Sequence, residues 1–228
     1  SYGLTGGIIR KDWLDDLGLP MPKTQEEYVN VLRAFRDNDM NGNGDPNDEF
    51  PTGGRAEARW MDHLFNMYGI AMDEGRPDWD IYDGEITYSA VTPNMRDALA
   101  FIASRYEEVL LDPETFLNGA SDWNGKISSN RVGSYFHFGE RVSDHLQNIE
   151  QASGIRADFS VLPVLEAPGY EDQGFVTLKK LRKPRWVVKN NEDEKKLMAS
   201  LKLLNNLADP DIWFDLFYGV EGMHHEVV

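Results

Sequence analysis

The chain has 228 residues, enough for one large domain or two small ones around a sizeable buried core. Its hydrophobic content of 41% argues against disorder, and its formal net charge of −16 disfavours nucleic acid and anionic membranes as partners. It has no cysteine, which excludes a disulfide scaffold, a thiol nucleophile and a Cys-ligated zinc site. No apolar run approaches the roughly 18 residues of a membrane span.

Both ends of the chain resemble internal positions of a longer protein. Ser1 is not an initiator Met, and Val228 stands in an apolar stretch. We therefore expect sequence beyond both ends.

The first third of the chain predicts two helices and a short helical stripe. Residues 8–14 lead into a Gly/Pro segment and predict a short helix, and residues 24–27 (Thr-Gln-Glu-Glu) form a capping box with Thr24 as N-cap. The helix that follows carries a buried stripe at Tyr28, Val31, Leu32 and Phe35 and leads into residue 37. A further helical stripe consists of Trp60, Leu64, Phe65 and Tyr68.

The middle of the chain predicts a hairpin and a long helix. Residues 71–85 are rich in turns, and residues 82–85 (Tyr-Asp-Gly-Glu) predict a hairpin turn before a strand at 86–88. Thr92 and Pro93 open the long helix as N-cap and first helical residue. Its expected core face is Met95, Leu99, Ile102, Tyr106 and Val109.

The last part of the chain predicts short strands followed by two helices. We expect a loop at 117–130, strands at 132–139, 159–164 and 186–188, and a loop at 166–174. A second capping pattern at 191–194 opens one helix, and Asp209-Pro210 opens the last. The predicted fold class is α/β and helix-rich, with residues 1–228 as a single domain.

An oxygen-rich segment covers residues 37–49, with the sequence Asp-Asn-Asp-Met-Asn-Gly-Asn-Gly-Asp-Pro-Asn-Asp-Glu. Calcium takes six to eight hard oxygen ligands, and a glycine allows the tight turn that presents them. One register starts at Asp37 and closes at Asp48; the other starts at Asp39 and closes at Asp48 and Glu49. We prefer the second, because an adjacent Asp-Glu pair supplies a bidentate ligand and one more oxygen.

The sequence therefore predicts a structural Ca²⁺ site. Its expected ligands are Asp39, Asn41, Asn43, Asp45 (through its carbonyl), Asp48 and Glu49. The alternative is an acidic, glycine-rich surface turn without metal. Because metal binding is then folding free energy, we expect the site to stabilise the fold rather than to hold the solute.

Several catalytic and nucleotide-binding motifs are missing from the sequence. It has no phosphate-binding loop, no dinucleotide-binding glycine motif and no His-Glu-x-x-His. Residues 119–123 begin like a nucleophile elbow but lack its second glycine. Carboxylates are plentiful, but the sequence singles out no glycosidase pair.

Several segments together carry a family resemblance. They are residues 9–19, 21–24, the loop at 39–51, residues 82–86, Thr92-Pro93 with its helix, and residues 131–133, 208–210 and 218–222. In this order they resemble the family 1 extracellular solute-binding proteins of bacterial ABC importers. The most similar group is the large sugar-binding lipoproteins with a single EF-hand-like calcium loop, and the resemblance covers essentially the whole chain.

The resemblance implies a fold and a function. Such proteins have two α/β lobes of the type II periplasmic-binding-protein kind, joined by hinge strands, with the solute between the lobes. This chain would be most of one lobe, without the segments that the family carries before Ser1 and after Val228. It would bind a solute rather than catalyse, work with ABC permease subunits, and lie at the cell surface or in the periplasm. A lipid anchor outside this chain would hold it to the membrane.

Sugar sites combine aromatic faces for the ring with a few polar groups for the hydroxyls. The residues that we expect to contact the solute are Trp60, Trp123, Phe136, His137, Arg185 and Trp186. For each aromatic residue the alternative is core packing, and for Arg185 it is a surface salt bridge. Trp123 is the most promising aromatic residue because it lies in a polar segment without an apolar stripe.

Three functions compete at this stage. The leading one is the receptor lobe for an oligosaccharide or a related carbohydrate. A carbohydrate-active enzyme with a structural calcium is the second, and cleavage assays distinguish it from the first. The third is a calcium-dependent adhesion or scaffolding module of dockerin type. Such modules carry two calcium loops in a much shorter chain, whereas this chain has one such loop in 228 residues. Fold by itself does not determine the solute.

Overall fold

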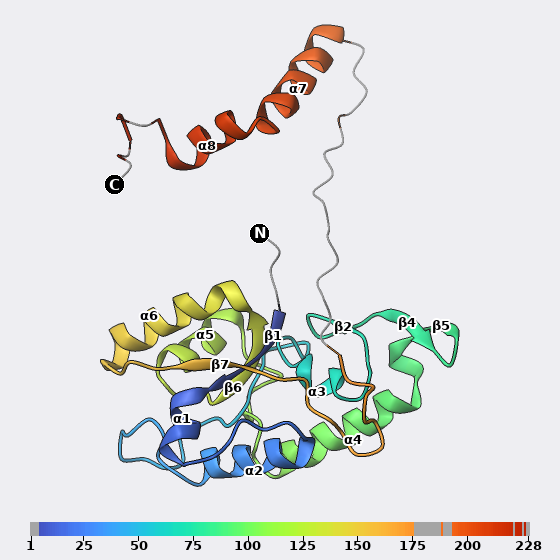
Figure 1. Ribbon diagram of the computed structural model, residues 1–228, viewed down its shortest axis with the longest axis vertical. Coiled ribbons are helices and arrows are strands. Elements are labelled where there is room, and N and C mark those ends of the chain that lie inside the picture. Colours follow the sequence, from blue (N-terminus) through green and yellow to red (C-terminus); the bar gives the residue numbers. More distant parts are fainter. Residues whose placement is uncertain (1–4, 176–187, 189–192, 221, 225, 227–228) are drawn as a thin grey trace. The chain divides into compact units, whose positions relative to one another are not determined.

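The computed structural model describes residues 5–175, 188, 193–220, 222–224 and 226 (Figure 1). Two compact units divide the chain, and we call Ser1–Leu181 unit 1 and Arg182–Val228 unit 2. Each is described by itself, so the expectation of a single domain over residues 1–228 stays a prediction.

The centre of unit 1 is a three-stranded antiparallel sheet with the order β6-β1-β7. Its strands are β1 (Thr5–Arg10), β6 (Ser134–Phe138) and β7 (Phe159–Leu162). β6 and β7 lie where strands were predicted. β1 was missed, because residues 8–10 were read as the start of a helix. Ile8 and Ile9 are both buried in the central strand, so the usual alternation of apolar and polar residues is absent there.

Helices cover both faces of this sheet (Figure 1). Ile9 packs into a core formed with residues of α1, α2, α3 and α4, whereas Ile8 packs into a second core with residues of α5 and α6. The helices of unit 1 are α1 (Lys11–Asp16), α2 (Gln25–Arg36), α3 (His63–Asn66), α4 (Pro93–Glu107), α5 (Ala120–Ser128) and α6 (Val142–Ser153). Unit 1 is therefore a helix–sheet–helix layer structure, as the α/β prediction requires.

The predicted helix starts at α2 and α4 are confirmed. The Thr24 side chain accepts a hydrogen bond from the Glu27 backbone N–H at 3.2 Å, and the Glu27 carboxylate accepts one from the Thr24 N–H at 3.2 Å. Thr92 caps α4, which begins at Pro93. These are local hydrogen bonds and backbone preferences, so short sequence motifs suffice to predict them.

Two of the expected buried stripes are only partly correct. On α4, Met95 and Ile102 are buried as expected together with Ala98, whereas Leu99 and Tyr106 are exposed. Val109 is also exposed, and it lies beyond the end of α4 at Glu107 with a positive φ of 59°. The expected helix from Trp60 to Tyr68 is confined to α3, because Trp60 has a positive φ of 65° and lies outside it. A positive φ is incompatible with a helix.

The loop expected at 117–130 contains the helix α5. Its start is capped by the Asp122 carboxylate, which accepts a hydrogen bond from the Gly119 N–H at 3.1 Å. Trp123 and Ile127 stand four residues apart on one buried face. A spacing of four residues between two apolar side chains is typical of a helix. The other residues of α5 are polar or small, and the sequence therefore predicted a loop.

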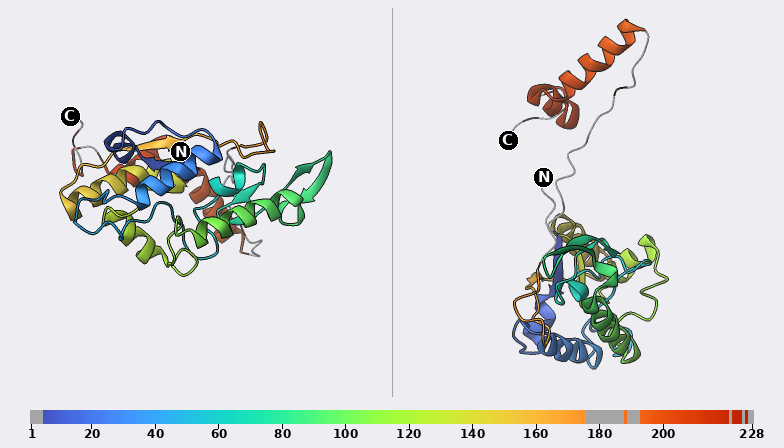
Figure 2. Two further views of the ribbon diagram at one scale, coloured as in Figure 1. Left: turned by 90° about the horizontal axis from the view of Figure 1, so that it is seen from below. Right: turned by 90° about the vertical axis from the view of Figure 1, so that its right-hand side faces the viewer.

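Two small antiparallel ribbons follow α3. β2 (Met72–Asp73) pairs with β3 (Arg76–Pro77), and β4 (Trp79–Tyr82) pairs with β5 (Glu85–Tyr88) around the predicted hairpin turn. The left view of Figure 2 shows the β4–β5 ribbon standing out at one end of unit 1. Short 3₁₀ turns, Ser89–Val91 and Gly139–Arg141, lead into α4 and α6.

Unit 2 contains the two helices predicted at the end of the chain, α7 (Glu194–Leu207) and α8 (Pro210–Tyr218). Most of their apolar side chains are exposed, including Leu203, Trp213 and Phe217. An exposed apolar surface of this kind normally has a partner. The strand predicted at 186–188 falls on residues that, apart from Val188, lie outside the described part of the chain. No helix among the described residues is long and apolar enough to cross a membrane.

Candidate functional site

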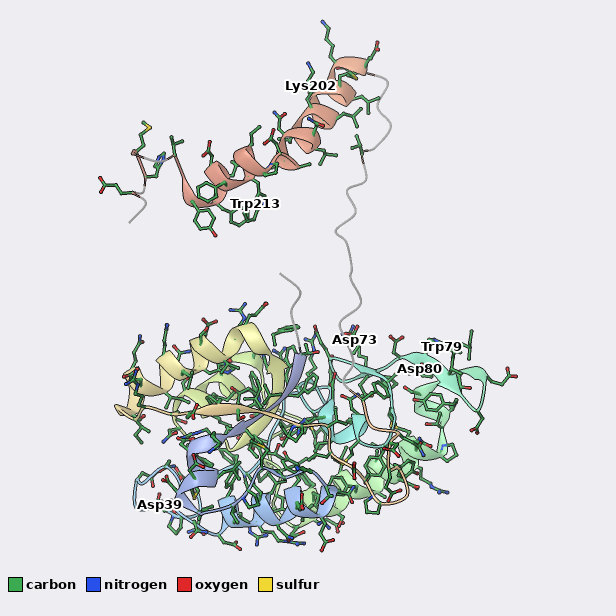
Figure 3. The ribbon with its side chains drawn as sticks, viewed as in Figure 1. Asp39, Asp73, Trp79, Asp80, Lys202 and Trp213 are labelled. Carbon is green, nitrogen blue, oxygen red and sulfur yellow. The ribbon has the colours of Figure 1, made fainter. Side chains whose placement is uncertain are left out.

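The oxygen-rich loop turns back on its own side chains directly after α2. Both carboxylate oxygens of Asp39, which is labelled in Figure 3, accept backbone hydrogen bonds, from Asn43 N at 3.1 Å and Gly44 N at 2.8 Å. The Asn41 amide oxygen also accepts from Asn43 N, at 2.9 Å. Gly42 and Gly44 have positive φ angles of 71° and 92°, which glycine adopts without a steric penalty.

The end of the loop returns to its beginning. The Asp48 carboxylate accepts from the side-chain amides of Asn41 and Asn43, at 2.8 and 3.0 Å. One oxygen of Glu49 accepts from Asn41 N at 3.1 Å, whereas its other oxygen is buried and has no hydrogen-bond partner among the described residues. Burial raises the pKa of Glu49. A buried carboxylate oxygen without a partner is a group that a cation would satisfy.

This geometry favours the register that begins at Asp39. The Asp37 carboxylate points to Arg36, with an ion pair at 2.7 Å, so the alternative register would lose its first ligand to an arginine. The Asp45 side chain accepts a hydrogen bond from Asn47 N at 3.1 Å, and the role of its carbonyl as a ligand stays a prediction.

The donor set of the loop fits calcium in kind, since it consists of carboxylate and amide oxygens. Across the described residues, however, no three side chains of His, Cys, Asp or Glu gather as a metal-binding group. In the loop, amide groups separate the carboxylates and hydrogen-bond to them. Calcium therefore stays a prediction.

The structure brings three of the predicted solute-binding residues together in one aromatic cluster. The ring centroids of Trp60 and His137 are 4.2 Å apart, and Trp123 stacks on His137 at 5.2 Å and lies 6.4 Å from Trp60. Phe136 stacks instead on His63, with centroids 6.2 Å apart and the rings almost parallel at 2°. The chain segments that supply these rings are far apart in sequence, so only the fold joins them.

These rings lie inside unit 1 rather than on its surface. Trp123 is 2% exposed, and Trp60 and Phe136 are buried with it in the second core. His137 is also buried. Three of their polar atoms have no hydrogen-bond partner among the described residues, namely Trp60 Nε1, Trp123 Nε1 and His137 Nδ1. Burial supports core packing, and a role in solute contact stays a prediction for all four. Arg185 and Trp186 lie outside the described residues.

A small cavity of unit 1 lies beside the three strands of the sheet. Its volume is about 20 Å³, and it is lined by Gly7, His63, Asn66, Phe136, Leu162, Pro163, Val164, Leu165 and Phe175. Such a volume holds one water molecule. The Phe175 N–H donates a hydrogen bond to the Asn66 carbonyl at 3.3 Å.

A second small hollow lies beside β1, β2 and β6. It is lined by Thr5, Asp62, Met72, Asp73, Glu74, Phe136 and Phe138. Asp62 accepts hydrogen bonds from the N–H groups of Glu74 and Gly75 at 2.9 and 2.8 Å, and burial raises the pKa of its carboxyl to about 6. These carboxylates are not predictable from the sequence, because no motif distinguishes them from the many other acidic residues.

The three histidines of unit 1 predict a loss of stability in mild acid. Burial lowers the pKa of His63 to about 3 and of His137 and His145 to about 4. Between pH 6.5 and 4 the unfolded chain then binds more protons than the folded chain, so each histidine removes up to about 1.4 kcal/mol of stability per pH unit as the pH falls. The raised pKa of Asp62 acts in the opposite sense below about pH 6.

Nuclear magnetic resonance of the imidazole protons, combined with urea unfolding at several pH values, measures both effects. We expect none of the three imidazoles to titrate above pH 5 while the protein is folded. A midpoint near 6.5 for any of them would contradict its burial as a neutral ring.

Comparison with characterised proteins places this geometry in context. Lipoprotein LipO of Bacillus subtilis is 27% identical over 243 residues, which cover 96% of this chain and 44% of LipO. The fructooligosaccharide ABC transporter substrate-binding protein FusA of Streptococcus pneumoniae is 32% identical over 170 residues, 70% of this chain and 28% of FusA. No family model matches the chain.

Solved structures give the same result for the fold. FusA, as an EF-hand mutant in complex with fructo-nystose, superimposes with a TM-score of 0.70 and 25% identity, covering 97% of this chain and 43% of FusA. An HMO-binding, ABC-transporter-associated solute-binding protein of Bifidobacterium longum infantis gives a TM-score of 0.78 at 22% identity, covering 97% of this chain and 46% of that protein. The chain thus spans less than half of the length of these relatives.

The sheet with helices on both faces is part of the α/β fold of a periplasmic solute-binding protein. The chain belongs to the substrate-binding proteins of bacterial ABC transporters, and its relatives among them include sugar-binding proteins.

Proposed function

We propose that the protein containing this chain is the extracellular solute-binding component of an ABC importer and binds an oligosaccharide in a cleft between two lobes. The observation that carries the proposal is the 32% identity with FusA, a fructooligosaccharide-binding protein. Unit 1 would be one of the two lobes. The protein would deliver its solute to permease subunits without altering it.

The exposed apolar side chains of unit 2 are consistent with its being part of a larger protein. Trp213, Phe214 and Phe217 on α8 are 45%, 46% and 70% exposed, too much apolar surface for an isolated helix pair in water. In the proposed protein these apolar side chains would be covered by a partner surface. A lipid anchor outside this chain, as expected for a relative of the lipoprotein LipO, would place the protein at the cell surface or in the periplasm.

The loop at residues 39–49 would bind one calcium ion in a structural role. Support comes from its all-oxygen donor set, from the buried oxygen of Glu49 and from the likeness to FusA, one structure of which is an EF-hand mutant. Asp39, Asn41, Asn43, Asp48 and Glu49 would provide side-chain oxygens, and Asp45 its carbonyl. The ion would fix the turn between α2 and the rest of unit 1.

A thermal-shift panel on the full-length protein tests the binding proposal. In the presence of calcium, we expect one or more oligosaccharides to raise the melting temperature, since a ligand at about a hundred times its dissociation constant adds roughly 2.7 kcal/mol of stability. The panel would include kestose, because a FusA structure holds that sugar.

The same samples analysed by chromatography separate binding from catalysis. Recovery of intact sugar after a clear shift supports a binding protein. Cleavage products would contradict the proposal and favour a carbohydrate-active enzyme, and a panel without any shift would reject carbohydrate as the solute.

A further inference from the structure

Arg55 is a half-buried arginine whose guanidinium has no hydrogen bond or ion pair to any described residue. Removing such a charge from water without a counter-ion is unfavourable. Every other described arginine that is buried or half-buried forms an ion pair with a carboxylate (Arg10, Arg33, Arg36, Arg59, Arg105 and Arg131). In a chain with 39 acidic and 23 basic residues, Arg55 is therefore exceptional, and it is available to an anion from outside the described residues.

The backbone holds Arg55 at the start of a tight turn that ends at Trp60. The Arg55 N–H donates a hydrogen bond to the Arg59 carbonyl at 3.0 Å. Within the turn Glu57, Ala58 and Trp60 have positive φ angles of 65°, 55° and 65°. Non-glycine residues in this conformation are strained, and such strain is concentrated at functional sites, where the surrounding structure maintains it.

The side chains beside this turn carry buried nitrogens that lack an acceptor. The ring centroids of Trp60 and Trp123 lie 4.2 and 5.2 Å from that of His137. Four atoms of this region have no hydrogen-bond partner among the described residues, namely Arg59 Nε, Trp60 Nε1, Trp123 Nε1 and His137 Nδ1. The arginine and tryptophan nitrogens can only donate. A buried donor without an acceptor is rare, so an oxygen-rich group that entered this region would satisfy them.

The charges that act on His137 are positive. Burial lowers the pKa of His137 to about 4, and the charges of Arg141 and Arg55 act in the same direction. Arg141 has a carboxylate partner, Asp144, at 3.0 Å, whereas Arg55 has none among the described residues. The region therefore attracts a negative group, although the chain as a whole has a net charge of −16.

We propose that Arg55 binds a carboxylate of the solute beside Trp60 and His137, and hence that the solute is an acidic oligosaccharide. Arginine binds a carboxylate through two parallel N–H···O bonds, and a uronic acid presents that group. The neighbouring nitrogens would donate to other oxygens of the same sugar. The inference rests on the proposed function and names the class of its solute. A carboxylate from another part of the protein is the competing partner of Arg55.

Calorimetric titration of the full-length protein tests the charge of the solute. The probes are trigalacturonate and trimannuronate, the methyl ester of each, and kestose as a neutral sugar. We expect one of the acidic sugars to bind best, at least about tenfold more tightly than its own methyl ester at low ionic strength, because only the free carboxylate pairs with Arg55. Added salt should reduce this difference.

Three variants then test the residue with the tightest acidic probe. Arg55→Gln should weaken binding about tenfold to a hundredfold and leave the affinity for the methyl ester unchanged. Arg55→Lys keeps the charge without the planar fork, so its affinity should lie between those of the parent and Arg55→Gln. Arg96→Gln is the matched control, since it removes the same charge from a side chain on α4 that is 80% exposed. Its affinity should equal that of the parent.

Each failure has a different meaning. Tightest binding of a methyl ester or of kestose would overturn this inference while leaving the proposed function intact. An equal loss in Arg55→Gln and Arg96→Gln would overturn it in favour of a general effect of charge. If Arg55→Gln kept its affinity and lowered the melting temperature of the sugar-free protein, the partner of Arg55 would be a carboxylate of the protein itself. Absence of binding by every oligosaccharide would overturn the proposed function.

Discussion

Chelation of calcium should lower the free energy of unfolding of the full-length protein by about 3 to 4 kcal/mol, if the ion is present at a hundred to a thousand times its dissociation constant. The loop closes through Asp39, Asp48 and Glu49, whose negative charges lose their shared counter-ion when calcium leaves. Urea unfolding with calcium and with a chelator measures the difference.

Two aspartate variants provide the control. Asp39→Ala should abolish the stabilisation by calcium, whereas Asp37→Ala should retain it, because Asp37 pairs with Arg36 and stays outside the ring of donors. Affinity for the sugar, measured at a temperature where both forms are folded, should change little. If the chelator leaves the urea unfolding curve unchanged, the loop is a surface turn without metal.

Replacement of Trp123 by alanine should destabilise unit 1 by about 3 to 5 kcal/mol, the usual cost of removing a large buried aromatic side chain. Trp123 is 2% exposed and contacts four rings, with centroid distances from 5.2 to 6.4 Å, to Trp60, Tyr135, His137 and His145. Few neighbours could move to fill the space without disturbing that cluster.

Trp79→Ala is the matched comparison, since the same side chain is removed from a position that is 62% exposed. Its stability should stay within about 0.5 kcal/mol of the parent. Denaturant unfolding with tryptophan fluorescence or circular dichroism measures both variants. If Trp123→Ala kept its stability and lost only sugar affinity, Trp123 would be a ligand contact rather than a core residue.

Elements with a strong local signal were predictable from sequence. The capping box at Thr24, the Thr92-Pro93 start of α4 and the hairpin turn at residues 82–85 each depend on hydrogen bonds or backbone angles within a few residues. Elements without such a signal were missed. In β1 two adjacent isoleucines are both buried, so the alternation of a half-buried strand is absent. In α5 only Trp123 and Ile127 are buried, and the other residues are polar or small.

The candidate functional residues also differ in how well the sequence predicts them. The oxygen-rich loop at residues 37–49 could be recognised in the sequence from its alternating oxygen donors, but calcium binding there stays a prediction. The aromatic residues could be nominated as a class but not assigned a place. Trp123 was expected in a polar loop and is buried, whereas Trp79 was not nominated and is exposed beside Tyr88.

By itself the sequence determined the starts of α2 and α4, the hairpin turn, the oxygen-rich loop and the resemblance to solute-binding proteins, because these depend on residues that are neighbours in the chain. Only the tertiary structure decided which aromatic rings are core and which face solvent. Burial is set by what packs above a side chain, and Trp60, Trp123 and His137 come from segments more than ten residues apart in sequence. Long-range packing of β1 against β6 and β7 creates that environment, and no local pattern encodes it.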